Sequence, residues 1–285
     1  MRWNRGRLFF GGLLIVLGGA GGELSAQDTT AAPIAGGAVA GGQALASQVN
    51  DPTAPITLLQ LRDVIALPVT DSTGTGNLLQ LQFVQPIPKG KLIPIAQLSR
   101  TTLPLIWLPG PGSDWGFGDI EFFDIGLLPA KWGRWGFGVS FVFPTASSTT
   151  LGQGKWQVGP AFGLIISGIP NLQFGVVMQN PISFAGASDR PSVNSLSISP
   201  TLTYNFPQGW FAGYSDFEWS FNWEDNGNAA IPLGIQAGKV VRIGKRHFVF
   251  SVEGGKFVAR QGALSPEWVI GIEAAWVVKT HLLRH

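Results

Sequence analysis

One segment of the chain, residues 193 to 206, alternates between apolar and small polar residues almost without exception. It reads VNSLSISPTLTYNF. Because successive side chains of a β-strand point to opposite faces, the pattern predicts a strand with one apolar and one polar face. A soluble β-sandwich would bury the apolar face, whereas a membrane β-barrel would turn it towards lipid. In a barrel, the polar face of this strand would line the interior. That face consists of Ser195, Ser197, Ser199, Thr201, Thr203 and Asn205.

Similar alternation elsewhere predicts twelve strands. They are expected at about 56–70, 78–88, 91–105, 119–128, 134–144, 155–168, 172–182, 193–206, 210–223, 231–243, 247–259 and 267–279. The first is ambiguous, because ITLLQLRDVIAL after Asp51, Pro52 and Thr53 also fits a short amphipathic helix. The polar faces are rich in Gly, Ala and Ser and poor in Lys and Glu. This composition favours a crowded barrel interior over a solvent-exposed sandwich face.

The connections between the predicted strands alternate in length. The longer ones include LPGPGSDWGFG, TASSTTLGQG, SFAGASDRPS, EDNGNAA and RQGALSPE, and the shorter ones are KG, PAKWGR, IPN, PQG and GKR. Outer-membrane barrels have short periplasmic turns and longer extracellular loops. An even number of strands then leaves both chain ends in the periplasm, so the pattern favours a barrel.

Composition agrees with this class and excludes others. Charged residues make up 13% of the 285 residues, against roughly 25% in ordinary soluble domains. Several tryptophans lie near strand ends, as in the aromatic girdles of membrane barrels: Trp132, Trp135, Trp156, Trp210, Trp223 and Trp268. No basic patch suggests a nucleic-acid partner. The absence of Cys excludes disulfides, thiolate catalysis and Cys-based metal sites.

The N-terminus has the layout of a secretory signal peptide. Arg2, Arg5 and Arg7 precede the apolar stretch LFFGGLLIVLGGAGG, and ELSAQ offers a cleavage site after Ala26. We therefore expect a signal peptide at 1–26. Residues 27–55 are Ala- and Gly-rich and predict a flexible leader or a plug of the lumen. The barrel is expected at 56–279, and a polar tail at 280–285.

Catalytic chemistry has little support in the sequence. The three histidines are His247, His281 and His285, and they show no HxxxH-type spacing. His247 and Ser251 lie too far apart on one strand for proton transfer. The stretch LGQGKW lacks the spacing of a phosphate loop. We expect no catalytic residue, metal site or cofactor, and therefore no enzyme.

Charged and polar residues on the polar faces are candidates for lining the lumen. They are Arg62, Arg134, Lys155, Gln157, Gln173, Gln179, Asp216, Glu218, Asn222, Arg242, Glu253 and Glu273. Two interpretations are open: an internal salt-bridge network that holds the barrel, or a constriction that filters solutes. Lys256 is a further possible partner of the carboxylates, and Ala212 and Tyr214 share the predicted face of Asp216. Asp63 and Lys239 fall on the predicted lipid-facing side, where charge is costly, so either those strands bend or the predicted register is wrong there.

Several motifs, in order, resemble one known family. They are GFGD (116–119), FVFPTA (141–146), LGQGKWQVGP (151–160), QNPISFAG (179–186) and PLGIQAGK (232–239). The family comprises bacterial outer-membrane β-barrels assigned to transport for the phenol meta-cleavage (MetA) degradation pathway. The similarity spans roughly residues 50 to 278. It implies a barrel in the outer membrane that moves small, aromatic or hydrophobic compounds.

The resulting prediction is an all-β protein: a single transmembrane, antiparallel, up-and-down β-barrel of about twelve strands, within a range of 10–14. We expect an outer-membrane channel or transporter for passive passage of small solutes. The alternative is a non-conducting structural or adhesive barrel, because eight to twelve strands leave limited interior room. The expected partners are outer-membrane lipid, a small-molecule solute and the barrel assembly machinery.

Overall fold

The computed structural model describes residues 44–51, 54, 56–69, 74–91, 93–110, 113–261 and 266–278. They all belong to one compact unit, Ala35–His285. The predicted signal peptide, most of the predicted leader and the predicted tail lie outside the described residues. Within the described part, no helix has the length and apolarity that crossing a bilayer requires.

The secondary structure is almost entirely β. The strands are β1 (Thr57–Val69), β2 (Gly76–Ile87), β3 (Ala96–Leu108), β4 (Asp114–Phe117), β5 (Ile120–Ala130), β6 (Gly133–Phe143), β7 (Lys155–Ile169), β8 (Leu172–Gln179), β9 (Ile182–Gly186), β10 (Ser195–Asn205), β11 (Trp210–Tyr214), β12 (Trp219–Asn222), β13 (Asn228–Ile243), β14 (Arg246–Ala259) and β15 (Pro266–Val278). Two short 3-10 turns, η1 (Pro207–Gly209) and η2 (Trp223–Asp225), connect strands, and residues 44–49 form a short helix.

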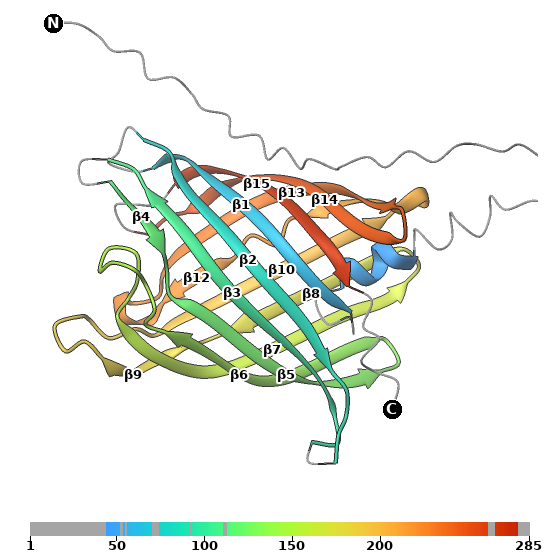
Figure 1. Ribbon diagram of the computed structural model, residues 1–285, viewed down its shortest axis with the longest axis horizontal. Helices are drawn as coiled ribbons and strands as arrows, with labels where there is room; N and C mark the ends of the chain where they lie inside the picture. The colour runs from blue at the N-terminus through green and yellow to red at the C-terminus, as the bar shows by residue number, and fades with distance from the viewer. Residues whose placement is uncertain are drawn as a thin grey trace, which may run out of the picture. The chain divides into compact units, whose positions relative to one another are not determined.

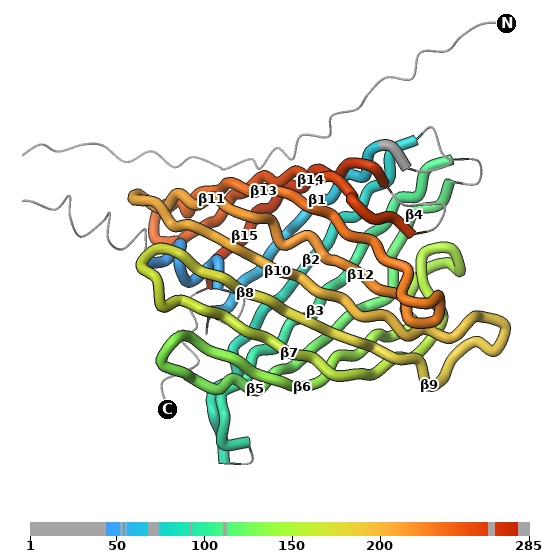
Figure 2. Tube along the Cα trace, turned by 180° about the vertical axis from the view of Figure 1, so that it is seen from behind, coloured from blue at the N-terminus to red at the C-terminus, as the bar shows by residue number. Residues whose placement is uncertain are grey.

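The strands close into an antiparallel barrel (Figures 1 and 2). Neighbours in sequence pair with each other, β1 pairs β15, and the pairing of β8 with β10 completes the ring. Three barrel strands are interrupted and consist of two segments each: β4 with β5, β8 with β9, and β11 with β12. The barrel therefore has twelve strands, which confirms the predicted fold class. The ambiguous first segment is strand β1 rather than a helix.

The two faces of β10 show which side of the wall is polar. Thr203 and Asn205 point into the barrel and are each 1% exposed, whereas Leu202 and Tyr204 point outwards and are each 43% exposed. The same arrangement holds for β6, β7 and β8, whose outward positions are apolar or aromatic. The barrel thus has an apolar outer surface, and β10 has a polar inner face, as the alternation of residues 193–206 predicted for a barrel.

Aromatic residues mark two levels on the outer surface. On β15, Trp268 and Trp276 lie eight residues apart and both point outwards. Lys256 Nζ lies 5.0 Å from the Trp268 ring centroid, and the Arg246 guanidinium carbon lies 5.1 Å from that of Trp276. Rings at the edges of an apolar band, each with a cation beside it, are typical of a headgroup boundary.

The connections sort by length between the two ends of the barrel. The end at which β1 begins and β15 finishes, here the terminal end, carries the connections 88–95, 131–132, 170–171, 206–209 and 244–245. The opposite end, here the far end, carries 70–75, 109–113, 144–154, 187–194, 223–227 and 260–265. Apart from the β2–β3 hairpin, which projects beyond the wall in Figure 1, the terminal end has the short turns.

Two predictions about residue orientation are wrong. The chain leaves the ladder at residues 215–218, between β11 and β12, so the inward side changes from odd- to even-numbered positions. Tyr214, like Ala212, therefore faces outwards, and Phe217 is buried inside at 4% exposure. Lys256 also faces outwards, where its Nζ lies 3.6 Å from Glu267 Oε1, because it shares the outward side of β14 with Phe250 and Val252.

Candidate functional site: the barrel interior

The short helix at 44–49 covers the terminal end of the interior. Its Ala46 is fully buried in an apolar cluster formed by the inner faces of surrounding strands, comprising Leu58, Phe211, Val240, Val249, Ala275 and Val277. Leu45 and Val49 pack against the same cluster. Burial of these side chains holds the helix against the inner faces of the strands. Residues 44–51 are here called the plug segment.

Polar contacts fix the C-terminal end of the plug segment to two strands. Asn50 Nδ2 donates to Asn205 Oδ1 on β10 at 3.1 Å, and to the Ala46 carbonyl at 2.9 Å. Asp51 forms a hydrogen-bonded ion pair with Arg134 on β6. Asn205 in turn donates to Gln173 Oε1 on β8 at 2.9 Å. These buried amides are paired with one another, which avoids the cost of unsatisfied polar groups.

Further along the barrel, a cluster of charged side chains crosses the interior. Arg62 on β1 lies 3.0 Å from Asp216 and 2.6 Å from Glu253, measured from Nη2 to a carboxylate oxygen. Its guanidinium also lies 5.5 Å from the Phe217 ring centroid. Beside it, Gln60 Nε2 donates to Glu273 Oε1 at 3.1 Å. The interruption at 215–218 makes this possible, because it turns Asp216 and Phe217 inwards.

A second arginine lies near two further carboxylates. Arg100 on β3 stacks on Phe123, with its guanidinium carbon 4.7 Å from the ring centroid. Glu121 and Glu218 interact electrostatically with Arg100, and Glu218 accepts a hydrogen bond of 2.8 Å from the Ser197 hydroxyl. The acidic belt, as we name the whole set, consists of Arg62, Arg100, Glu121, Asp216, Glu218, Glu253 and Glu273. Carboxylates outnumber guanidiniums in it, so the belt has an excess of negative charge.

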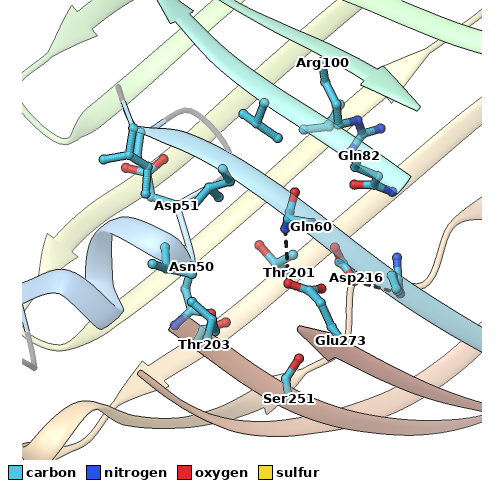
Figure 3. Close-up of a pocket in the computed structure, with 18 of the residues that line it drawn as sticks. Asn50, Asp51, Gln60, Gln82, Arg100, Thr201, Thr203, Asp216, Ser251 and Glu273 are labelled. Atoms are coloured by element: carbon cyan, nitrogen blue, oxygen red, sulfur yellow. Dashed lines mark hydrogen bonds and ion pairs between the residues drawn. The ribbon is translucent and has the colours of Figure 1, made fainter. Parts of the chain in front are cut away.

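A cavity of about 110 Å³ separates the plug segment from the acidic belt. Figure 3 shows Asn50 and Asp51 on one side of it and Gln60, Asp216 and Glu273 on another. Its apolar lining includes Val49, Leu58, Val84, Leu98, Phe211 and Val249. The Thr203 hydroxyl also borders it and has no hydrogen-bond partner among the described residues. The cavity is therefore amphipathic, with room for several water molecules or one small organic molecule.

The predicted lining residues do not all lie together. Arg62, Asp216, Glu218, Glu253 and Glu273 form most of the acidic belt, while Arg134 and Gln173 contact the plug segment or its partner Asn205. The others lie nearer the two mouths and make local contacts. Lys155 donates a hydrogen bond to the Ala187 carbonyl, Gln157 donates one to the Gln153 side chain, and Arg242 donates one to the Gly244 carbonyl. Asn222 caps η2, and Gln179 is the last residue of β8.

Residues of the interior that sequence reasoning missed include Arg100, Glu121, Asn50 and Asp51. Arg100 shares the inward side of β3 with Leu98 and Thr102, so its parity was a usable signal. Glu121 had none, because the inward positions of β5 are otherwise apolar. The plug residues lie outside any alternating pattern, and only the tertiary contacts reveal them.

At the far mouth, the GFGD motif has a structural role. Asp119 accepts backbone hydrogen bonds from Ala146 at 3.1 Å and Gln153 at 2.7 Å, both in the connection between β6 and β7. Arg190 Nη2 donates to the Gly152 carbonyl of the same connection at 2.6 Å. These contacts hold the longest connection at the rim. In the part of the chain that the structure describes, no group of three or more His, Asp or Glu side chains is arranged to hold a metal ion.

Comparison with known proteins supports the fold. No protein-family model matches this chain, and no curated protein does. An outer membrane channel from Pseudomonas putida F1 is similar in structure, with a TM-score of 0.57 and 12% identity over 79% of this chain and 96% of that chain. The NanC porin has a TM-score of 0.50 and 10% identity over 78% of this chain and 99% of that chain. The chain thus has the fold of a porin-like outer-membrane β-barrel.

Proposed function

We propose that this chain is an outer-membrane channel for the passive passage of small solutes. The observation that carries the proposal is the closed wall, which is apolar outside and encloses the acidic belt and a cavity. Closure pairs the backbone groups of the wall, which a bilayer requires because lipid offers no hydrogen bonds. The short terminal-end turns support periplasmic chain ends, and insertion by the barrel assembly machinery is part of the proposal.

The acidic belt supports a preference for cations and neutral molecules over anions. Its carboxylates come from β5, β14, β15 and the interruption between β11 and β12, so they face the interior from several sides. Rings of carboxylates are a common filter of cation channels. Arg62 neutralises part of this charge through Asp216 and Glu253, and the same contacts brace the wall. The filter and the salt-bridge network are therefore one structure.

The amphipathic cavity supports solutes that combine an apolar body with a polar group. Val84, Leu98 and Phe211 offer apolar contact, and Gln60 and Thr203 offer hydrogen bonds. A single small aromatic molecule with a hydroxyl group fits that combination. The association with phenol degradation rests on the sequence resemblance, and the substrate class stays a prediction.

A non-conducting barrel is the second candidate. It is favoured by the plug segment, which covers the terminal end through Ala46 and the pair of Asp51 with Arg134. In that case the interior polar groups would serve only to hold the wall, and outward surfaces or far-end loops would carry the function. The two candidates differ in one measurable property, the flux of solute through the purified protein.

Planar-bilayer conductance and liposome swelling with the refolded full chain test the proposal. We expect conductance with a reversal potential that shows cation preference in a KCl gradient, and swelling in small neutral solutes. A variant lacking residues 44–51 should conduct more than the full chain. Absence of both conductance and swelling in the full chain and in this variant, with heat-modifiable migration showing a folded barrel, would mean that the barrel is structural.

A further inference from the structure

Polar side chains on the outer surface gather on one side of the barrel. Outward positions of β1, β2, β3 and β5 carry Asp63, Asn77, Gln85, Gln97, Ser99, Thr101 and Asp124, here called the polar strip. These four strands are consecutive neighbours in the wall. Outward positions of the other described strands carry no Asp, Glu, Asn, Gln, Ser or Thr, and their cations lie beside tryptophans. The outer surface is therefore asymmetric.

The two carboxylates of the strip lie well inside the apolar band. Asp63 is opposite Ile272, which is midway between Trp268 and Trp276 on β15. Asp124 is opposite Val139, midway between the outward aromatics Trp135 and Phe143 on β6. The regular register on both sides of Asp63 excludes a local bend as the reason for its outward position. Acidic groups at such levels are costly against acyl chains.

Contacts within the chain satisfy these carboxylates only in part. Asp63 Oδ1 accepts a hydrogen bond from Asn77 Nδ2, a single bond for a group that can accept several. Asp124 accepts none from any described residue, and its Oδ1 is buried without a partner. A chain surrounded only by lipid would gain from apolar residues at both positions. Their presence indicates a protein surface against this side of the wall.

The composition of the strip fits a second copy of this chain. Its carboxylates accept hydrogen bonds, while its asparagine, glutamines and threonine donate them, so the surface complements itself. Around it lie half-exposed leucines, including Leu61, Leu81 and Leu103, that exclude water from polar contacts. Two packed sheets lie about 10 Å apart, a gap that two short polar side chains can bridge between them.

We propose that the outer face of β1, β2, β3 and β5 is the contact surface of a homodimer in the membrane. A two-fold interface uses the same surface on both copies, which agrees with one continuous strip. The inference needs the barrel to lie in lipid, which is part of the proposed function, but it does not need solute passage. Conductance and dimer formation can therefore fail independently.

Disulfide cross-linking tests the surface, because the native chain has no cysteine. Leu103→Cys places one thiol at the centre of the strip, opposite Leu81. Leu164→Cys is the matched control, an outward leucine on β7 opposite Trp135. In vesicles or outer membranes, oxidation should convert the Leu103→Cys protein to dimers and leave the Leu164→Cys protein monomeric. Equal cross-linking of the two variants, no cross-linking, or cross-linking of Leu103→Cys to a different protein would overturn the proposal.

A second measurement removes the polar groups. The double variant Asp63→Leu, Asp124→Leu should raise the dimer dissociation constant about tenfold, as expected for loss of two hydrogen bonds in a membrane. Heat-modifiable migration should be unchanged, since leucine suits a lipid-facing position. Asp63→Asn, Asp124→Asn should dimerise more tightly than the leucine variant, because amides keep the hydrogen-bonding capacity. Unchanged dimerisation of the folded leucine variant would contradict the inference, and the cross-linking result does not depend on that variant folding.

Discussion

Arg62 Nη2 lies 2.6 Å from Glu253 Oε1, and the pair joins β1 to β14 across the inner face of β15. The side chains are 13% and 7% exposed, so water does little to screen them. A second carboxylate, that of Asp216, lies 3.0 Å from the same nitrogen. Asp216 belongs to the interrupted strand of β11 and β12, which lies on the other side of β13 and β14. One guanidinium thus ties together parts of the wall that are distant in sequence.

Removing this guanidinium should weaken the barrel. Arg62→Met leaves the buried Glu253 without its counter-charge, and breaking a buried pair in this way costs about 3–5 kcal/mol of unfolding free energy. Arg242→Met is the control, because Arg242 is exposed at the terminal rim, where it donates to the Gly244 carbonyl. Urea unfolding of the refolded proteins in lipid measures the difference. Equal midpoints for the two variants would show that Arg62 does not brace the wall.

Release of the plug segment should increase conductance. Arg134→Met removes an ion-pair partner of Asp51. A hydrogen bond between charged groups contributes about 1.5–3 kcal/mol, so the population with the plug segment released should rise roughly tenfold to a hundredfold. Lys155→Met is the control at the far mouth, where the lysine contacts the Ala187 carbonyl. Single-channel recording should show longer or larger openings for Arg134→Met only. Identical traces for both variants would mean that the plug segment does not limit the current.

Neutralising the acidic belt should reduce the preference for cations. Glu218→Gln with Glu273→Gln removes two of the carboxylates that face the interior, and leaves Arg62 with its partners Asp216 and Glu253. The reversal potential in a KCl gradient should move towards zero because less negative charge faces the ions. Glu224→Gln, in the exposed turn η2 at the far end, is the matched control and should move it little. A larger shift from the control would place the filter in the loops.

Arginine should be tolerated very differently on the two sides of β10. Ile198 faces outwards opposite Met178 and Trp219, whereas Ser199 faces the interior. Ile198→Arg should cost roughly 2–4 kcal/mol if it lies near the bilayer midplane, and should slow assembly. Ser199→Arg should be milder, because the interior is polar. Heat-modifiable migration after refolding into vesicles reports both, and equal yields would mean that the two faces are assigned the wrong way round.

Much of the wall was predictable from residue alternation because its period is a local property. Thr203 and Leu202 lie on the sides that the alternation assigns to them, and the strands 134–144 and 155–168 agree closely with β6 and β7. The alternation of connection lengths also holds apart from the connection between β2 and β3, which was predicted to be short and is long, since a hairpin barrel places successive turns at opposite ends. These features depend on neighbouring residues and on strand count only.

The errors have two physical causes. An interruption of the ladder reverses the faces, and nothing in the sequence around Ser215 marks where pairing stops. On β5 the inward residues Phe123 and Ile125 are apolar and the outward Asp124 is charged, so polarity alone assigns the wrong sides there. Residue polarity identifies the inward and outward sides of a strand only where each side contacts one kind of environment along its whole length.

The sequence by itself determined the class of fold, the number of strands and the polarity of most of the wall, because these follow from period-two alternation and turn residues. Tertiary structure alone decided which polar groups meet: Arg62 with Glu253 and Asp216, and Arg134 with Asp51. Closure of β1 against β15, the interruption at 215–218 and the packing of the plug segment bring these groups within hydrogen-bond reach across 83 to 191 positions of sequence. No local pattern encodes contacts of that kind.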